Sequence, residues 1–208
     1  MENRGDTPDW AVAAIVAAGR RMDARGWVPA TAGNISVRLD AGRIAITRSG
    51  GHKGFLDADH IMQVDLQGTP LTPGKRPSAE TLLHCLVYHE YAEAGAVVHG
   101  HSVPATVLSM ADPHAGTIRF AGYELLKAFE GQTTHDTALD LPIVPNDQDI
   151  PRLAARVATL LRFGSPLGYL IRGHGVYVWG PDMETALARL EGLEFLLACE
   201  LERRKLPR

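Results

Sequence analysis

The sequence predicts an α/β fold that occupies residues 1–208 as a single domain, with a central mostly antiparallel or mixed β-sheet flanked by helices. Segments with helical periodicity alternate along the chain with short segments of strand-like pattern. Two pairs of strands form hairpins, at 35–47 around "DAG" and at 167–180 around "GHG". Strands that alternate with helices and also pair in hairpins are typical of a mixed sheet with helices on its faces. The length of 208 residues and the hydrophobic content of 45% are sufficient for one such core.

Helix boundary signals place the first elements. A helix is expected at 7–26, with Thr7 as a candidate N-cap and Gly26 at its end. A second helix is expected at 78–94, with Ser78 as its candidate cap. The elements that follow are a strand at 96–102, a short helix at 103–110, a strand at 116–124 that continues into a helix at 125–130, a strand at 139–144, a helix at 149–164, the second hairpin and a closing helix at 182–205.

Charge and cysteine content exclude several classes of protein. The chain has 21 Lys and Arg against 24 Asp and Glu, and no basic block apart from "ERRK" near its end, so a nucleic-acid partner is not expected. Cys85 and Cys199 lie far apart without a CxxC motif, which indicates a reducing compartment rather than a disulfide framework. Neither a signal peptide nor a membrane-spanning segment is expected. We therefore expect a cytoplasmic protein.

Three histidines have the pattern of metal ligands. His99 and His101 lie in the expected strand "AVVHGHS", where residues i and i+2 point to the same face. His174 lies between glycines in "RGHGV", where the backbone can bend and another group can approach closely. Three imidazoles leave an open position on zinc, which is the catalytic pattern. A hydrogen-bonded structural pair at His99 and His101 is an equally good interpretation of that motif alone. By contrast, His84 and His89 are expected at the surface or the edge of the core.

Three polar loops could bind an anion. "TAGNIS" at 31–36 and "TRSGGHKG" at 47–54 are rich in small residues with accessible backbone N–H groups, and Lys53 could add a positive charge. "KRPSAE" at 75–80 places Ser78 at the start of a helix. Each loop alone is explained better by ordinary turn chemistry than by anion binding. Together with a metal site, the three loops indicate a phosphorylated, sugar-like small-molecule substrate.

The segments "TAGNIS", "PSAE", "VVHGHS" and "IRGHGVYVWG", in this order, resemble the class II aldolase/adducin family. The resemblance extends from Trp10 to the final helix, and it implies the α/β fold of that family. It also implies a homotetramer with active sites near the subunit interfaces. The combination of motifs is specific, although no single motif is.

The resemblance implies a role for individual residues. His99, His101 and His174 would bind one divalent metal ion per subunit, usually Zn²⁺, with iron, cobalt or manganese as alternatives. The family often has a second serine after Ser78, whereas this chain has Ala79, which removes one hydroxyl contact with the phosphate. The phosphate-binding positions of the family map to Thr31, Gly33, Asn34, Ser49, Gly50 and Ser78.

Within the family, residues 120–150 and "RGHGVYVWG" resemble the dehydratase members more than the sugar-phosphate aldolases. The resemblance implies that Glu124, after the metal-binding strand, is the catalytic acid/base of a hydro-lyase. In the aldolases that role belongs to the glutamate matching Glu80. Spacing alone does not choose between these two carboxylates: Glu80 could be a first-turn helix residue and Glu124 a solvated residue at a helix start. The resemblance favours Glu124.

Three other functions compete with the dehydratase. A sugar-phosphate aldolase or epimerase of the same family would share the metal and the phosphate site. An adducin-like binding module without activity would be expected to have lost metal ligands, but all three histidines are present. A purely structural zinc site usually has four protein ligands, often cysteines, and neither cysteine lies near the histidines in the sequence.

Overall fold

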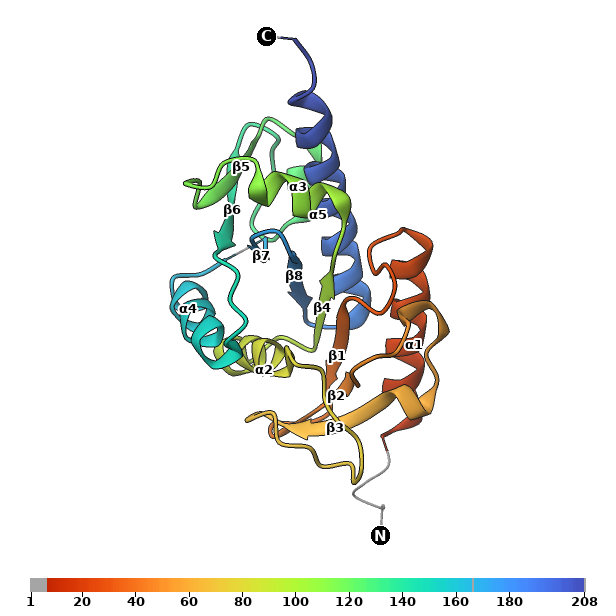
Figure 1. Cartoon of the computed structure of the whole chain (residues 1–208). Helices are drawn as coiled ribbons and strands as arrows, with labels where there is room; N and C mark the ends of the chain where they lie inside the picture. Colours follow the sequence, from red (N-terminus) through yellow and green to blue (C-terminus); the bar gives the residue numbers. More distant parts are fainter. Residues whose placement is uncertain (1–6, 166, 208) are drawn as a thin grey trace.

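The computed structural model describes residues 7–165 and 167–207, and its sheet contains eight strands (Figure 1). The strands are β1 (Asn34–Arg38), β2 (Arg43–Thr47), β3 (Ile61–Asp65), β4 (Ala96–Gly100), β5 (Thr117–Ala121), β6 (Ala138–Val144), β7 (Tyr169–Ile171) and β8 (Gly175–Gly180). Their order is β3-β2-β1-β4-β8-β7-β6-β5. Neighbouring strands are antiparallel except for the parallel pair β6 and β7. The predicted fold class, a mixed and mostly antiparallel sheet with helices, is confirmed.

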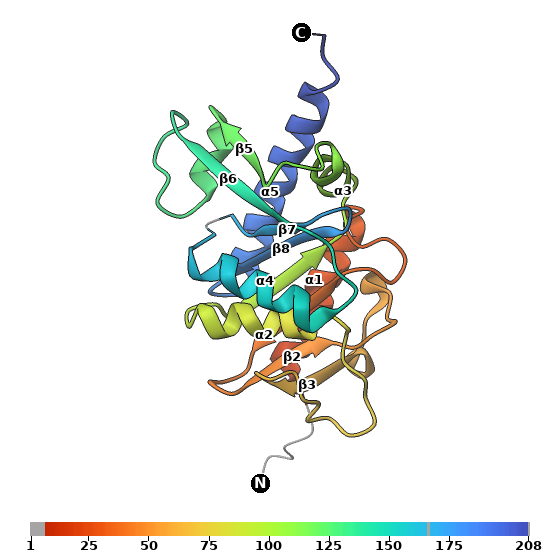
Figure 2. The same ribbon diagram turned by 60° about the vertical axis from the view of Figure 1, so that its left-hand side comes forward.

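Five α-helices cover the two faces of this sheet. They are α1 (Asp9–Ala24), α2 (Thr81–Glu90), α3 (Val103–Met110), α4 (Ile150–Arg162) and α5 (Met183–Arg203). Figure 2 shows α2 and α4 in front of the sheet and α1 and α5 behind it. In β4, Val98 packs into the core under α1, α3 and α5, whereas Val97 packs into the core under α2 and α4. Because side chains alternate along a strand, His99 points to the same side as Val97, toward α2.

Three of the expected helices differ from the prediction in their first residue, their cap or their type. The helix expected to begin at Ser78 begins at Thr81, with Glu80 at its N-cap position. The Ser78 carbonyl instead accepts hydrogen bonds from the backbone N and the Oγ1 of Thr81, so the cap prediction was wrong. Helix α1 has Pro8 at its N-cap position and no side-chain cap, so Thr7 is not its cap either. The segment expected as a helix at 125–130 is a 3₁₀ helix, η3 (Glu124–Ala128).

The sequence predicts neither a helix nor a strand between residues 48 and 77. This segment contains β3, which pairs with β2, and the 3₁₀ helices η1 (Lys53–Phe55) and η2 (Ala58–His60). His84 was expected at the surface or the core edge, but it is fully buried under the sheet. In the part of the chain that the structure describes, no helix is long and apolar enough to cross a membrane.

Candidate metal centre

Strand pairing brings the three predicted histidines together. His99 is the next-to-last residue of β4, and His101 follows directly after the strand. β8 pairs with β4, so the turn at 172–174 that precedes β8 lies beside the end of β4 and carries His174. A Cβ atom on Gly175 would lie 2.1 Å from the Gly100 carbonyl oxygen. Glycine at this position therefore allows the close approach on which the grouping of the histidines depends.

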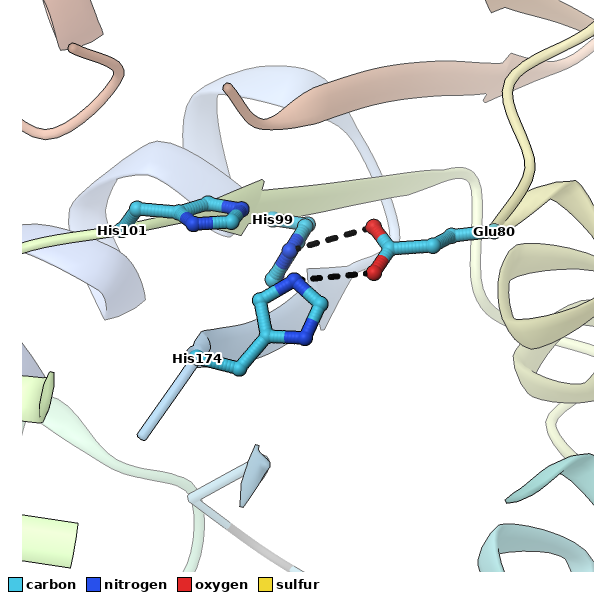
Figure 3. A group of neighbouring side chains, drawn as sticks. All are labelled: Glu80, His99, His101 and His174. Atoms are coloured by element: carbon cyan, nitrogen blue, oxygen red, sulfur yellow. Dashed lines mark ion pairs between the residues drawn. The ribbon is translucent and has the colours of Figure 1, made fainter. Parts of the chain in front are cut away.

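The histidines surround one carboxylate, that of Glu80. Figure 3 shows Glu80 approaching from the start of α2 toward His99 and His174, with His101 on the far side. The His174 Nε2 lies 2.9 Å from Glu80 Oε1, and the His99 Nε2 lies 3.2 Å from Glu80 Oε2. One ligand atom from each of the four residues lies within 4.8 Å of every other. The four residues are thus close enough together that they could hold one metal ion.

Contacts behind these side chains fix their orientation. The His99 Nδ1 lies 2.9 Å from the Val176 carbonyl, to which it donates as the N–H tautomer. The lone pair of Nε2 then points into the cluster. The Asn34 side-chain amide donates to Glu80 Oε2 at 3.1 Å. The backbone N–H of His101 donates to the Trp27 carbonyl at 2.6 Å. Such partners commonly set the tautomer and ring orientation of metal-binding histidines.

The protonation states suit a cation. Burial alone would raise the pKa of Glu80, but the facing His99 and His174 imidazoles hold it well below its ordinary value. Burial, with the charges of His99 and His174, lowers the pKa of His101 to about 3. When the rings are neutral, the positive charge that stabilises the Glu80 anion has to come from a bound cation instead of from the imidazole protons. Three imidazole nitrogens and one carboxylate are also the donors that zinc and similar divalent metals prefer, so the residues present fit a metal ion.

The predicted anion-binding loops converge on a cavity of about 330 Å³ above this cluster. Gly33 has a φ of +79°, and a Cβ atom there would lie 2.7 Å from the His99 carbonyl, so the first loop packs directly on the end of β4. His174, His101 and Glu80 form part of the cavity wall. The wall also includes all six predicted phosphate-binding residues, which are Thr31, Gly33, Asn34, Ser49, Gly50 and Ser78.

Two basic residues add positive charge to the cavity wall. Lys53, which the sequence indicated only as a positive group in its loop, is 2% exposed. Its Nζ donates to the Thr31 and Gly51 carbonyls, both at 2.7 Å, and so joins two of the loops. Burial lowers its pKa to about 8. Arg48, which no sequence pattern indicated, lines the same cavity, and its buried Nε has no hydrogen-bond partner among the described residues.

A fourth loop, at 146–148, was also missed. It follows β6, and its residues line the same cavity. Within it Asp147 forms ion pairs with Arg152 and Arg156 of α4. The polar sequence "PNDQD" directly after a strand was the signal that could have identified it.

Glu124 lies outside the cavity of its own chain. It is the first residue of η3, its side chain is 73% exposed, and it forms an ion pair with Lys127. The hydrogen bond from Lys127 lowers the pKa of the Glu124 carboxyl. Within one chain the structure thus groups Glu80, and not Glu124, with the three histidines. The catalytic role of Glu124 stays a prediction.

Comparison with known proteins agrees with the resemblance noted in the sequence. The family model of the class II aldolase and adducin N-terminal domain matches residues 13–201. The chain is 68% identical to the methylthioribulose-1-phosphate dehydratase of Granulibacter bethesdensis, over 96% of this chain and 94% of that protein. It is 64% identical to the protein of the same name from Gluconacetobacter diazotrophicus, over 97% and 98% of the two chains.

Solved structures with the same fold include YgbL of Klebsiella pneumoniae, with a TM-score of 0.81 and 26% identity over 95% of this chain and 91% of that one. The L-fuculose-1-phosphate aldolase of Thermus thermophilus has a TM-score of 0.74 and 29% identity, over 92% and 94% of the two chains. The matched family model covers most of the chain, including the cavity and all four residues of the metal-ligand cluster. The chain belongs to the class II aldolase/adducin family.

Proposed function

We propose that the chain is a metal-dependent methylthioribulose-1-phosphate dehydratase of methionine salvage. It would convert 5-methylthioribulose 1-phosphate into 2,3-diketo-5-methylthiopentyl 1-phosphate. The observation that carries this proposal is the cluster of Glu80 with three histidines at the wall of a cavity rimmed by anion-binding loops. Relatives that are 64–68% identical over nearly the whole chain have this name, which supports the choice within the family.

The loops hold the phosphate in this proposal. Backbone N–H groups at 33–34 and 49–50 and the Ser78 hydroxyl would contact its oxygens. Lys53 keeps one of its three N–H donors free for the cavity, because the other two bind carbonyls. Arg48 supplies a second cation. Holding one end of the substrate fixes the position of its ketone relative to the histidines, and this positioning is a large part of the rate enhancement.

His99, His101 and His174 would hold one Zn²⁺ per subunit, or another divalent ion, with Glu80 beside it. When bound, the metal supplies a Lewis acid at the C2 ketone oxygen and makes the neighbouring C3 proton acidic. A carboxylate then removes the C3 proton, the C4–O bond breaks, and the same group returns the proton so that the hydroxyl leaves as water. The resulting enol gains a proton at C4 and loses one from oxygen, which gives the diketone.

We assign the proton transfers to Glu124, supplied by a neighbouring subunit. Its carboxylate is outside the cavity of its own chain, and its side chain is exposed at the surface where another subunit can meet it. Glu80 is less suited to the role, because its two oxygens already face His99 and His174. This assignment requires an oligomer in which η3 of one chain reaches the cavity of the next.

The proposal includes the organisation of the protein. We propose one class II aldolase/adducin-like domain over 1–208, assembled as a homotetramer in the cytoplasm. The exposed apolar side chains of Val103, Met110 and Phe195, at 69%, 60% and 56% exposure, support a contact between subunits. Light scattering should give a mass near four chains, and a stable monomer at working concentration would contradict both the tetramer and the assignment of Glu124.

The activity is tested by incubating the purified, metal-loaded protein with 5-methylthioribulose 1-phosphate and following the product by mass. A dehydratase produces a species lighter by one water. An aldolase would cleave a carbon–carbon bond and produce two fragments, and an epimerase would leave the mass unchanged. If no dehydrated product forms and one of the other two results is found, the protein is an aldolase or an epimerase and not a dehydratase.

A further inference from the structure

Helix α3 connects two of the three histidines of the metal-ligand cluster. His101 directly precedes Ser102, the N-cap residue of α3, whose side chain accepts a hydrogen bond from the first turn of the helix. His174 is the last residue of the turn at 171–174, which is hydrogen-bonded to the other end of the same helix. The rings of the two histidines have centroids 4.6 Å apart. The contact of this turn with α3 therefore helps to set the distance between two metal ligands.

The backbone of the turn that carries His174 is tied to side chains of α3. The Gly173 N–H donates to the Ser109 Oγ at 2.9 Å, and Ser109 is fully buried. The Ser109 hydroxyl in turn donates to the Thr106 carbonyl at 2.8 Å. The Thr106 hydroxyl lies 2.9 Å from the Ser102 carbonyl and 3.3 Å from the His174 carbonyl. It therefore lies between the segment that follows one histidine and the turn that carries the other.

The Arg172 side chain joins the same turn to the end of α3. Its Nη1 donates to the carbonyls of Ser109 and Asp112 at 2.7 and 2.8 Å, and its Nη2 donates to the Ala115 carbonyl at 2.6 Å. Ser109 is in the last turn of α3, where the carbonyls have no partners within the helix. The helix dipole also favours a cation at this end. Because Arg172 lies two residues before His174, these bonds hold the ligand-bearing turn against α3.

We infer that Arg172, together with Ser109, is a positioning residue of the metal centre, which sets the place of His174 relative to His101 by holding its turn on α3. This inference rests on the proposed metal site. The described residues that form the cluster and line the cavity do not include Arg172. A change in metal binding after its removal would therefore be transmitted through the turn.

Arg38 provides a matched control for this role. Its guanidinium also donates to three carbonyls at the end of a helix and in the loop after it, those of Tyr88 at 2.8 Å, Tyr91 at 3.1 Å and Ala94 at 2.7 Å, after α2. Arg38 is the last residue of β1, whereas the first residue of that strand pairs with His99. Exchange of either arginine for methionine removes one charge and three hydrogen bonds. A difference in metal binding therefore reports the place of the arginine and not a general loss of stability.

The test is a titration of the metal-depleted full-length proteins with Co²⁺, followed by the visible d–d absorption, together with chelator competition for Zn²⁺. We expect Arg172→Met to weaken the binding of both metals about tenfold, the lower end of the effect of losing groups that orient metal ligands. It should also change the Co²⁺ spectrum, because the d–d bands report the geometry of the ligands. Arg38→Met should match the wild type in both measurements. Thermal melts of the metal-free proteins set a titration temperature at which all three are folded.

Equal effects of Arg172→Met and Arg38→Met on metal binding, or an unchanged Co²⁺ spectrum in Arg172→Met, would overturn the inference and leave the proposed function standing. A wild-type protein that binds neither Co²⁺ nor Zn²⁺ would overturn the metal site itself, and the two failures are thus distinguishable. Should Arg172→Met not fold, Ser109→Ala removes the separate hydrogen bond to the Gly173 N–H and leaves the arginine in place. It should shift the Co²⁺ band, and an unchanged band would again overturn the inference.

Discussion

Glu80 and Glu194 are both buried carboxylates, at 8% and 4% exposure, yet they lie in opposite electrostatic surroundings. Glu80 faces two imidazoles and accepts a hydrogen bond from Asn34. Glu194, on α5, has no hydrogen-bond partner for either oxygen among the described residues. Burial raises the pKa of Glu194 to about 7, whereas the histidines hold that of Glu80 well below its ordinary value.

The difference shows that depth alone does not decide the charge of a buried acid. Desolvation acts on both residues in the same direction, and the groups that face each carboxylate decide the sign of the net shift. Glu80 is kept as an anion in a cluster that fits a cation. Burial disfavours the anion of Glu194, and no charged group among the described residues opposes this effect. Loss of a partner of Glu80 should therefore disrupt the cluster, whereas loss of the charge of Glu194 should stabilise the protein.

The largest effect is expected from removing a partner of Glu80. His174→Ala deletes one of three nitrogen donors and one of the two imidazoles facing the carboxylate. We expect bound metal to fall well below one equivalent and turnover to be lost. Elemental analysis after dialysis measures the metal, with a thermal melt to confirm folding.

His89→Ala is the matched control for that experiment. His89 is on α2, its side chain is 72% exposed, and it lies outside the metal-ligand cluster. This variant should keep full metal content and activity. A full equivalent of metal in His174→Ala would show that His174 is not the third ligand.

The next largest effect is expected at Glu124, the exposed carboxylate to which we assign the proton transfers. Glu124→Gln keeps the shape of the side chain but cannot accept a proton. Metal and phosphate binding should persist, while the dehydration rate falls by roughly 10²–10⁴, the usual contribution of a positioned acid/base. Diketone formation is measured with metal content in parallel.

Two other variants complete the assignment. Glu130→Gln changes another exposed glutamate of the same segment, paired with Arg189, and should be nearly silent. Glu80→Gln should disturb metal or substrate placement more than the chemical step. Near-wild-type turnover in Glu124→Gln with a collapse in Glu80→Gln would reverse the two roles and favour the aldolase interpretation.

Much of this site could be predicted from local sequence patterns. The i, i+2 rule grouped His99 and His101, and glycines on both sides marked His174 as a turn residue and the candidate third ligand. Gly, Ser and Asn marked the loops that line the cavity. The hairpins indicated a mixed sheet, although they did not determine its strand order, which depends on long-range packing.

The residues that local patterns missed depend on partners far away in the chain. Lys53 is buried because carbonyls at 31 and 51 meet its Nζ, and no periodicity predicts such a contact. β3 is a five-residue strand followed by a Gly- and Pro-containing segment, so it gave little signal. The position of Glu124 outside the cavity of its own chain could not be predicted either, because a motif match does not place a side chain in space.

A smaller effect is expected at Lys53, the buried cation that lines the same cavity as Glu80. Lys53→Met removes the charge and both links between the loops. Hydrogen bonds of charged groups contribute about 1.5–3 kcal/mol, so KM for the phosphorylated substrate should rise about 10- to 100-fold while kcat changes less. Steady-state kinetics measures the split between the two constants.

Lys75→Met is a matched control, because Lys75 also donates to two backbone carbonyls, those of Ala58 and Ile61, but lies outside the cavity. Its KM should stay near that of the wild type. If both lysine variants raise KM equally, Lys53 has no specific role in binding the phosphate.

The smallest effect on activity is expected at Glu194, where removal of the carboxylate should raise the stability of the protein at high pH. Its folded-state pKa of about 7 lies above the ordinary value of 4.5, so the unfolded chain loses this proton first as the pH rises. The free energy of unfolding therefore falls between about pH 4.5 and 7, by about 3 kcal/mol in total. Glu194→Gln removes this loss. It should be more stable than the wild type at pH 8 and equal to it below about pH 4.5, as measured by denaturant unfolding at both pH values.

Glu202→Gln, at an exposed site on the same helix, should show no such pH dependence. A Glu194→Gln protein that is less stable than the wild type at pH 8 would show that a cation meets this carboxylate in the assembled protein, as the histidines meet Glu80.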